Sequence, residues 1–299
     1  MNLEYSMHIP VLKEEVLKYL HPKKNENIID ATIDGLGHAK EIVKFIKPEG
    51  KIIGFEWTPE VYEIAQKIIE QENLKDNIKV VLENFANMEN VVKEENFKNI
   101  KGVLFDLGYS NYHIEFIKRG FSFKYREQPL DMRYNPEKQI LKASDIVNNY
   151  SVVELARIFR EYGEERGAFK IAKYIVENRK KKIKTVGEFL EVLEKCVRRK
   201  SNIHFATKIF QALRIEVNRE LENLEEGLEG ALNILESGGR LVVISFHSLE
   251  DRIVKNFLKK AQKNNLAKIL TKKPIVPSKK EVLENPKSRS AKLRALEKI

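Results

Sequence analysis

The sequence predicts an α/β fold, in which helices cover both faces of a mostly parallel sheet and a mostly helical domain is inserted into the chain. Two observations support this prediction. Short apolar runs alternate with amphipathic segments in residues 1–111, and the same alternation resumes in residues 211–299. Between them, residues 112–210 show helical periodicity and no convincing buried strand.

The first α/β unit lies in residues 28–56. A short apolar run ends at Asp30, a turn contains Gly35 and Gly37, and a second apolar run ends at Glu56 after an amphipathic segment. Glycine lets the backbone approach a ligand closely, and an acid that ends the second strand can accept hydrogen bonds from two ribose hydroxyls. This order is typical of a nucleotide-type cofactor site. It does not choose between a dinucleotide and another adenosine-containing cofactor.

The other elements follow from periodicity and from helix start and stop signals. Thr58 and Pro59 predict the start of a helix, with Thr58 as N-cap and proline at the first helical position. Ser248 and Asp251 have capping-box spacing, so Ser248 is expected to cap a helix. We expect helices at residues 11–20, 144–148, 152–162, 165–179, 185–197 and 215–235, and further strands at 79–82, 102–107 and 240–245.

The change of rhythm predicts the domain organisation. Residues 1–111 and 211–299 are expected to form one α/β domain, and residues 112–210 a helical substrate-recognition insertion. The tail, residues 274–299, looks loop-like and basic.

Composition narrows the class of protein. Of the 299 residues, 42% are hydrophobic and 33% are charged, which fits a folded globular chain. No apolar run approaches the roughly 20 residues of a membrane span. A single cysteine, Cys196, excludes an internal disulfide and favours the cytoplasm, and six scattered histidines give no metal-ligand spacing.

The net charge of +10 is distributed unevenly. Residues 1–111 carry 14 Lys and Arg against 19 Asp and Glu, whereas residues 112–210 carry 22 against 13 and residues 211–299 carry 18 against 12. Such an asymmetry is expected when one part of a protein faces a polyanion. Lysine-rich solvated surface is the alternative explanation.

Four groups fall at or just beyond the ends of the first four strands: Asp30, Glu56, Phe85 and Asp106. In parallel sheets, ligands bind outside the carboxyl ends of the strands. Four aligned positions therefore favour a cofactor crevice over solvated strand ends. Phe85 can stack on an adenine ring, although a lone Phe more often belongs to a core.

Several longer motifs resemble the MraW/RsmH family of S-adenosylmethionine-dependent methyltransferases, which modify a cytidine N4 in small-subunit ribosomal RNA. They are DLGYSNYH at 106–113, PLDMR at 129–133, FQALRIEVN at 210–218, ISFHSLEDRIVK at 244–255 and SRSAKLR at 288–294. The resemblance extends from residue 8 to residue 294. It implies a class I methyltransferase fold with a helical insertion.

The resemblance also implies a cofactor site for S-adenosyl-L-methionine, with contacts at Leu36, Gly37, His38, Glu56, Phe85, Asp106 and His113. The chain departs from the family pattern here. Asp34 and Leu36 stand where the family has glycine, Glu56 replaces an aspartate, and His113 replaces a glutamine. Leu36 is expected to crowd the cofactor if its side chain points toward it.

The expected reaction is methyl transfer to the exocyclic amine of a cytidine in small-subunit ribosomal RNA, free or in an assembling small subunit. Asp106 and Ser110 are the candidate catalytic residues. The candidate RNA contacts are Arg119, Arg133, Lys180, Lys181, Lys182, Arg198, Arg199 and Arg214. Two alternatives stay open: a related enzyme with another nucleic acid or protein substrate, and a non-catalytic binder of RNA or of assembling ribosomes. The oligomeric state is left open.

Overall fold

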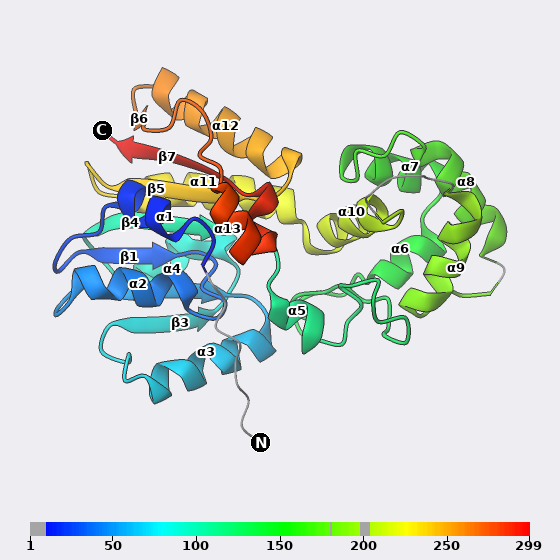
Figure 1. Ribbon diagram of the computed structural model, residues 1–299, viewed down its shortest axis with the longest axis horizontal. Helices are drawn as coiled ribbons and strands as arrows, with labels where there is room; N and C mark the ends of the chain where they lie inside the picture. The colour runs from blue at the N-terminus through cyan, green and yellow to red at the C-terminus, as the bar shows by residue number, and fades with distance from the viewer. Residues whose placement is uncertain (1–9, 180, 198–203) are drawn as a thin grey trace. The chain divides into compact units, whose positions relative to one another are not determined.

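The computed structural model describes residues 10–179, 181–197 and 204–299 (Figure 1). The chain forms two compact units. The sheet unit comprises the residues up to 108 together with 221–299, and the helical unit comprises residues 109–220. The sequence placed the boundaries at 111/112 and 210/211, so residues 109–111 and 211–220 belong to the helical unit instead of the α/β domain. Helix α10 (Thr207–Asn218) causes the difference at 211–220, because it packs against α6 (Ala143–Asn149) and α7 (Val152–Glu161) of the helical unit.

The sheet unit is built on seven strands in the order β3-β2-β1-β4-β5-β7-β6. Strands β1 to β5 run parallel, and β7 runs antiparallel between β5 and β6. This arrangement is that of class I methyltransferases, so the expected fold class is confirmed. The strands are β1 Asn27–Asp30, β2 Ile52–Glu56, β3 Ile78–Leu82, β4 Ile100–Asp106, β5 Arg240–Ser245, β6 Ala267–Ile269 and β7 Lys292–Lys298.

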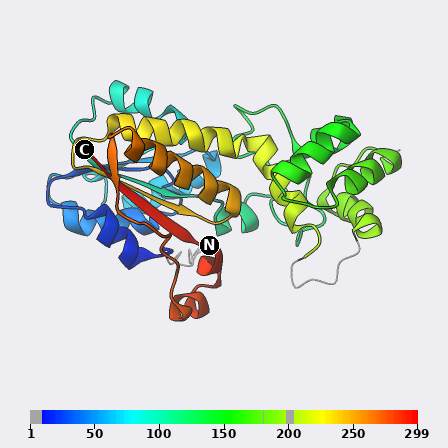
Figure 2. The ribbon, with the colours of Figure 1, turned by 90° about the horizontal axis from the view of Figure 1, so that it is seen from above.

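Helices cover both faces of this sheet (Figure 2). One face packs against α1 (Lys13–Leu20), α2 (Gly37–Ile46) and α3 (Pro59–Gln71), whose apolar residues form one core with the sheet. The other face packs against α4 (Met88–Glu94), α11 (Glu220–Ile234) and α12 (Ser248–Lys263) in a second core. The amphipathic periodicity that predicted these helices therefore reflects burial on the sheet.

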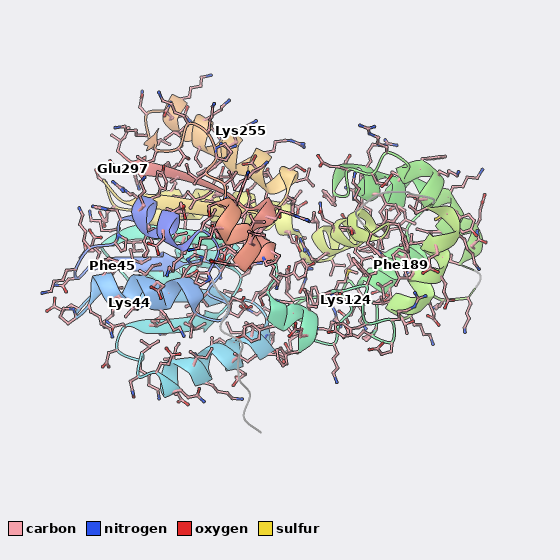
Figure 3. The ribbon with its side chains drawn as sticks, viewed as in Figure 1. Lys44, Phe45, Lys124, Phe189, Lys255 and Glu297 are labelled. Atoms are coloured by element: carbon pink, nitrogen blue, oxygen red, sulfur yellow. The ribbon has the colours of Figure 1, made fainter. Side chains whose placement is uncertain are left out.

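The tail was predicted wrongly as a loop. It forms α13 (Lys279–Glu284), a short 3-10 helix (Pro286–Ser290) and β7, which lies inside the sheet. The charged residues in KLRALEK interrupt the apolar pattern by which a strand is predicted from sequence. Arg294 is buried because Asp251 of α12 accepts a hydrogen bond from its Nε at 2.6 Å, and Glu297 pairs with Arg240 on β5 at 3.1 Å (Glu297 is labelled in Figure 3).

The helix at residues 215–235 was predicted as one element and is two. Helix α10 ends before Arg219, which has a left-handed backbone with φ 50°, and α11 begins at Glu220. The cap of α12 also differs from the prediction. His247, not Ser248, is the N-cap, and it forms the capping box with Glu250.

The helical unit has a core of its own. It contains α5 (Asn111–Glu115), α6, α7, α8 (Ala168–Asn178), α9 (Val186–Cys196) and α10. Five of these helices contribute fully buried side chains, among them Phe159 of α7 and Phe189 of α9 (Phe189 is labelled in Figure 3). Thr185 caps α9 in a capping box with Glu188, which fixes where that helix begins.

Among the described residues, every helix is too short or too polar to cross a bilayer. In the same part of the chain, no three His, Cys, Asp or Glu side chains are grouped so that they would hold a metal ion.

Candidate cofactor site

Three acids end three neighbouring strands of the sheet unit. Asp30, Glu56 and Asp106 are the last residues of β1, β2 and β4, which lie in the order β2-β1-β4. Because the strands are parallel, all three acids lie at the same edge of the sheet. The structure thus brings together the predicted Glu56 and Asp106, with Asp30 on the strand between them.

The loop after β1 is tied to both neighbouring strands. The amide of Ala31 donates to the carbonyl of Leu104 on β4 at 2.8 Å, and the amide of Ile33 donates to the carbonyl of Phe55 on β2 at 3.1 Å. Thr32 contributes its side chain, since its Oγ1 accepts a hydrogen bond from the amide of Asp106 at 2.6 Å. These bonds give the loop a defined path across the carboxyl ends of the strands.

Burial shifts the protonation of two of the acids. It raises the pKa of Asp30 to about 7, and the neighbouring Asp106 and Asp34 add to the rise, while His38 and the Thr32 amide oppose it. Burial also raises the pKa of Glu56 to about 8, with a further contribution from Asp34. A carboxyl that is out of water and near other carboxylates holds its proton more tightly. The edge of the sheet therefore offers acids that titrate near neutral pH.

His38 lies in the first turn of α2 and faces Asp106. Its Nε2 is 3.5 Å from Oδ2 of Asp106, and its side chain is buried. A protonated His38 would form an ion pair with this carboxylate, whereas the neutral ring adds only a dipole. The residue that the resemblance assigned to the cofactor turn thus contacts the predicted catalytic acid.

The turn that precedes α2 is strained at two positions. Asp34 has φ 41° and Leu36 has φ 65°, in the left-handed region that favours glycine. Leu36 does not meet the condition for crowding a cofactor, because its side chain is fully buried in the core with residues of α1, α2 and α3. The chain keeps the backbone shape of a glycine turn and uses the extra side chain for packing. Gly37 follows as the first residue of α2.

Phe85 lies just after β3, in the 3-10 helix Phe85–Asn87. Its ring packs edge-to-face on Phe105 of β4 with centroids 5.3 Å apart. Gly227 of α11 makes room for it, because a Cβ on Gly227 would lie 2.7 Å from the ring. Phe85 is half-buried, so it combines a core contact with an accessible remainder.

Ser110 and His113 belong to the helical unit, where they cap α5. Oγ of Ser110 accepts a hydrogen bond from the amide of Tyr112 at 3.2 Å, and the amide of Ser110 donates to Nδ1 of His113 at 3.2 Å. Since Nδ1 accepts, the proton of the neutral ring resides on Nε2. Burial lowers the pKa of His113 to about 3, and the positive charges of Arg119 and Arg214 add to this effect. His113 is neutral at physiological pH.

Of the predicted RNA-contacting arginines, Arg119 and Arg214 are buried inside the helical unit and Arg133 is half-buried. Arg133 donates two hydrogen bonds to Asp131, at 2.8 and 2.7 Å, and Arg214 donates two to Glu220, at 2.8 and 3.0 Å. Arg119 is 9% exposed. The guanidinium groups of Arg133 and Arg214 thus bond to acids of the same unit, and RNA contacts by these three arginines stay a prediction. Lys181 and Lys182 are exposed, and the predicted Lys180, Arg198 and Arg199 lie outside the described residues.

Sequence reasoning missed two features of these sites. Thr32 has no motif of its own, and only the folded loop shows that its hydroxyl bonds Asp106. Glu220 is the partner of Arg214 because α10 ends before Arg219. The left-handed backbone of Arg219 turns the chain and brings Glu220, six positions after Arg214, within reach. Spacing six would not place two side chains on one face of a continuous helix, so periodicity concealed this pair.

Comparison with known proteins connects this geometry to a family. The sequence profile of the MraW methylase family matches residues 5–299. A protein from Dictyoglomus thermophilum named ribosomal RNA small subunit methyltransferase H is 45% identical over 294 residues, which cover 98% of this chain and 97% of that protein. Proteins of the same name from Persephonella marina and a Sulfurihydrogenibium species are 44% and 45% identical over 296 residues, covering 98% of this chain and 99% of each relative.

Proposed function

The chain belongs to the MraW methylase family, and we propose that it transfers a methyl group from S-adenosylmethionine to the exocyclic N4 amine of a cytidine in small-subunit ribosomal RNA. The observation that carries the proposal is the convergence of Asp30, Glu56 and Asp106 at the carboxyl edge of the sheet, beside a helix-opening turn. A purely structural α/β sheet has no need for two buried acids and a third, half-buried one at one edge, since burying carboxylates is unfavourable.

The donor set fits an adenosyl cofactor with a cationic end. Glu56 has a carboxylate that can accept ribose hydroxyls, and Phe85 keeps an accessible part of its ring for an adenine. Asp30 and Asp106 place negative charge where an ammonium or a sulfonium would be stabilised. We assign Gly37 and His38 to the turn that the cofactor approaches. When bound, S-adenosylmethionine supplies an electrophilic methyl group.

The residues after β4 are the proposed holders of the target amine. The exocyclic nitrogen of cytosine is a poor nucleophile because its lone pair is delocalised into the ring, so orientation and proton acceptance both matter. Asp106 can accept an N–H hydrogen bond and take up the proton. The hydroxyl of Ser110 already caps α5, so we propose that Ser110 and its cap partner His113 shape this loop. A paired base cannot reach such a crevice, so the target cytidine must be unpaired or flipped out.

The helical unit is the proposed RNA-binding part. Residues 112–210 have an excess of Lys and Arg, whereas the first part of the chain is acidic. Lys181 and Lys182 of the helical unit are exposed. Phosphate contacts of this kind supply affinity without sequence specificity. We propose that the partner is small-subunit ribosomal RNA, alone or in an assembling small subunit, which places the protein in the cytoplasm.

The test is methyl transfer to defined RNA. Purified protein is incubated with labelled S-adenosylmethionine and small subunits from a strain lacking the activity, and the RNA is digested and examined by mass spectrometry. We expect one methylated cytidine, and a strong loss of transfer in Asp106→Asn. Methylation of another base or of a ribosomal protein would refute the assigned substrate. RNA binding without methyl transfer would favour the non-catalytic alternative.

A further inference from the structure

Tyr109 differs from the aromatic residues that surround it in the helical unit. It is 38% exposed, whereas Tyr112 is 7% and Phe121 is 5% exposed. An exposed aromatic ring in a protein that binds nucleic acid is a natural stacking surface, since every base has a π-face. Exposure alone does not distinguish this role from that of a solvated tyrosine. The contacts that hold the ring in place distinguish the two.

One face of the Tyr109 ring rests on Arg214. The guanidinium carbon is 4.4 Å from the ring centroid, within the range of a cation–π contact. Arg214 is itself buried and held by two hydrogen bonds to Glu220, at 2.8 and 3.0 Å. This buried ion pair gives the tyrosine a fixed backing, so little rotamer freedom remains to be lost on binding.

Further rings hold the same arrangement. The rings of Tyr109 and Phe121 are stacked, with an angle of 25° between them and centroids 6.3 Å apart. Phe121 stacks in turn on Tyr134 at 5.4 Å, and the hydroxyl of Tyr134 donates to Glu220 at 3.1 Å. Arg214, Glu220, Phe121 and Tyr134 therefore form a closed set of contacts around one exposed ring.

We propose that Tyr109 is a stacking platform for an unpaired nucleobase of the RNA substrate, with Arg214 and Glu220 as its positioning residues. This inference rests on the proposed function and adds a specific base contact to it. The exposed part of the ring accepts the face of the base.

The experiment compares Tyr109→Ala and Tyr109→Phe with the parent protein. Steady-state kinetics use small subunits as substrate, and binding uses a short single-stranded RNA carrying a fluorescent cytosine analogue, whose emission changes when it stacks. We expect Tyr109→Ala to raise KM for RNA roughly five- to a hundredfold, to abolish the emission change and to leave S-adenosylmethionine affinity intact. Tyr109→Phe keeps the π-face and should behave like the parent protein.

Phe169→Ala is the matched control, because Phe169 is a 55% exposed aromatic residue of the same unit, on α8. It should leave KM and the emission change unaltered. An unchanged emission response in Tyr109→Ala, a parent protein that gives no response, or an equal loss in Tyr109→Phe would each overturn the platform. The emission assay needs no methyl transfer. A parent protein that stacks the analogue through Tyr109 but methylates nothing would therefore contradict the proposed function and leave the platform standing.

Discussion

Glu56 is the residue whose protonation should govern binding of the ribose. It is 8% exposed, accepts a hydrogen bond from the amide of Thr58 at 2.7 Å, and has a pKa raised to about 8. The folded protein therefore holds a proton that the unfolded chain has lost above about pH 4.5. Between that pH and about 8, Glu56 makes the unliganded protein less stable as the pH rises.

Ligand binding should show the opposite trend. Only the ionised carboxylate can accept both ribose hydroxyls, so affinity should increase between about pH 7 and 9, by up to about tenfold per pH unit for one linked proton. Calorimetric titration with adenosine measures this, because adenosine has the ribose but no titrating amino-acid end. Glu56→Gln should bind more weakly and with a flatter pH profile. Affinity that is independent of pH in the parent protein would contradict the role of Glu56.

Leu36 allows packing and backbone strain to be separated. Its side chain is fully buried, yet its φ is 65°. Leu36→Ala removes the packing and keeps the strain, and should lower the free energy of unfolding by about 3 kcal/mol. Leu36→Gly removes both and should be about 1 kcal/mol more stable than the alanine variant. Urea denaturation of the two variants measures the difference. An alanine variant as stable as the glycine variant would show that the turn is not strained.

At the residue scale, the sequence identified important side chains well. It predicted their roles less well. The acids at strand ends were predicted because a strand end is visible as the last residue of an apolar run. The direction of a side chain is not visible in this way. Leu36 and Arg214 were both assigned to a ligand, and both point into the protein. Leu36 packs against core residues distant in sequence, and Arg214 bonds to Glu220 beyond the end of α10. Their burial follows from tertiary structure alone.

At the scale of elements, periodicity predicted most of the longer helices and the five parallel strands, but not β6 or β7. Parallel strands are buried on both faces and read as apolar runs. Strand β7 contains Lys292, Arg294 and Glu297, and each of these has an ion-pair partner on α12 or β5. A strand whose charges are neutralised by its neighbours loses the apolar pattern, which is why the tail resembled a loop. Asp251, which pairs with Lys292 and Arg294, belongs to the ISFHSLEDR block. Part of that motif is therefore explained by contacts with β7.

The segment between α8 and α9 gives a test of RNA binding at this scale. Lys181 and Lys182 are exposed in a unit with an excess of positive charge. Reversing both to Glu should weaken binding to small-subunit RNA and reduce the slope of log K against log salt by about two, because two fewer counterions are released. Anisotropy titrations at several salt concentrations measure this. Lys67→Glu with Lys93→Glu is the control, since both residues are exposed in the acidic first part of the chain and the charge change is the same. Equal effects of the two pairs would mean that only net charge matters.

On the scale of the whole molecule, the two units have separate cores. The sheet unit buries two apolar clusters, one against each face of the sheet, and the helical unit buries its own set of side chains from α6 to α10. Units with independent cores can unfold independently. The proposed cofactor groups at the strand ends belong to the sheet unit, whereas the proposed RNA-binding lysines belong to the helical unit.

Scanning calorimetry should therefore resolve two unfolding transitions, and S-adenosylmethionine should raise only one of them. A ligand at 100 times its Kd stabilises the state that binds it by about 2.7 kcal/mol. Because the acids at the strand ends lie in the sheet unit, the transition of that unit should move to higher temperature while the other stays in place. Hydrogen exchange assigns the transitions, since amides of β1, β2 and β4 should gain protection on cofactor binding. Glu56→Ala should reduce the shift at the same cofactor concentration. If both transitions move together by the same amount, the sheet unit does not bind the cofactor by itself.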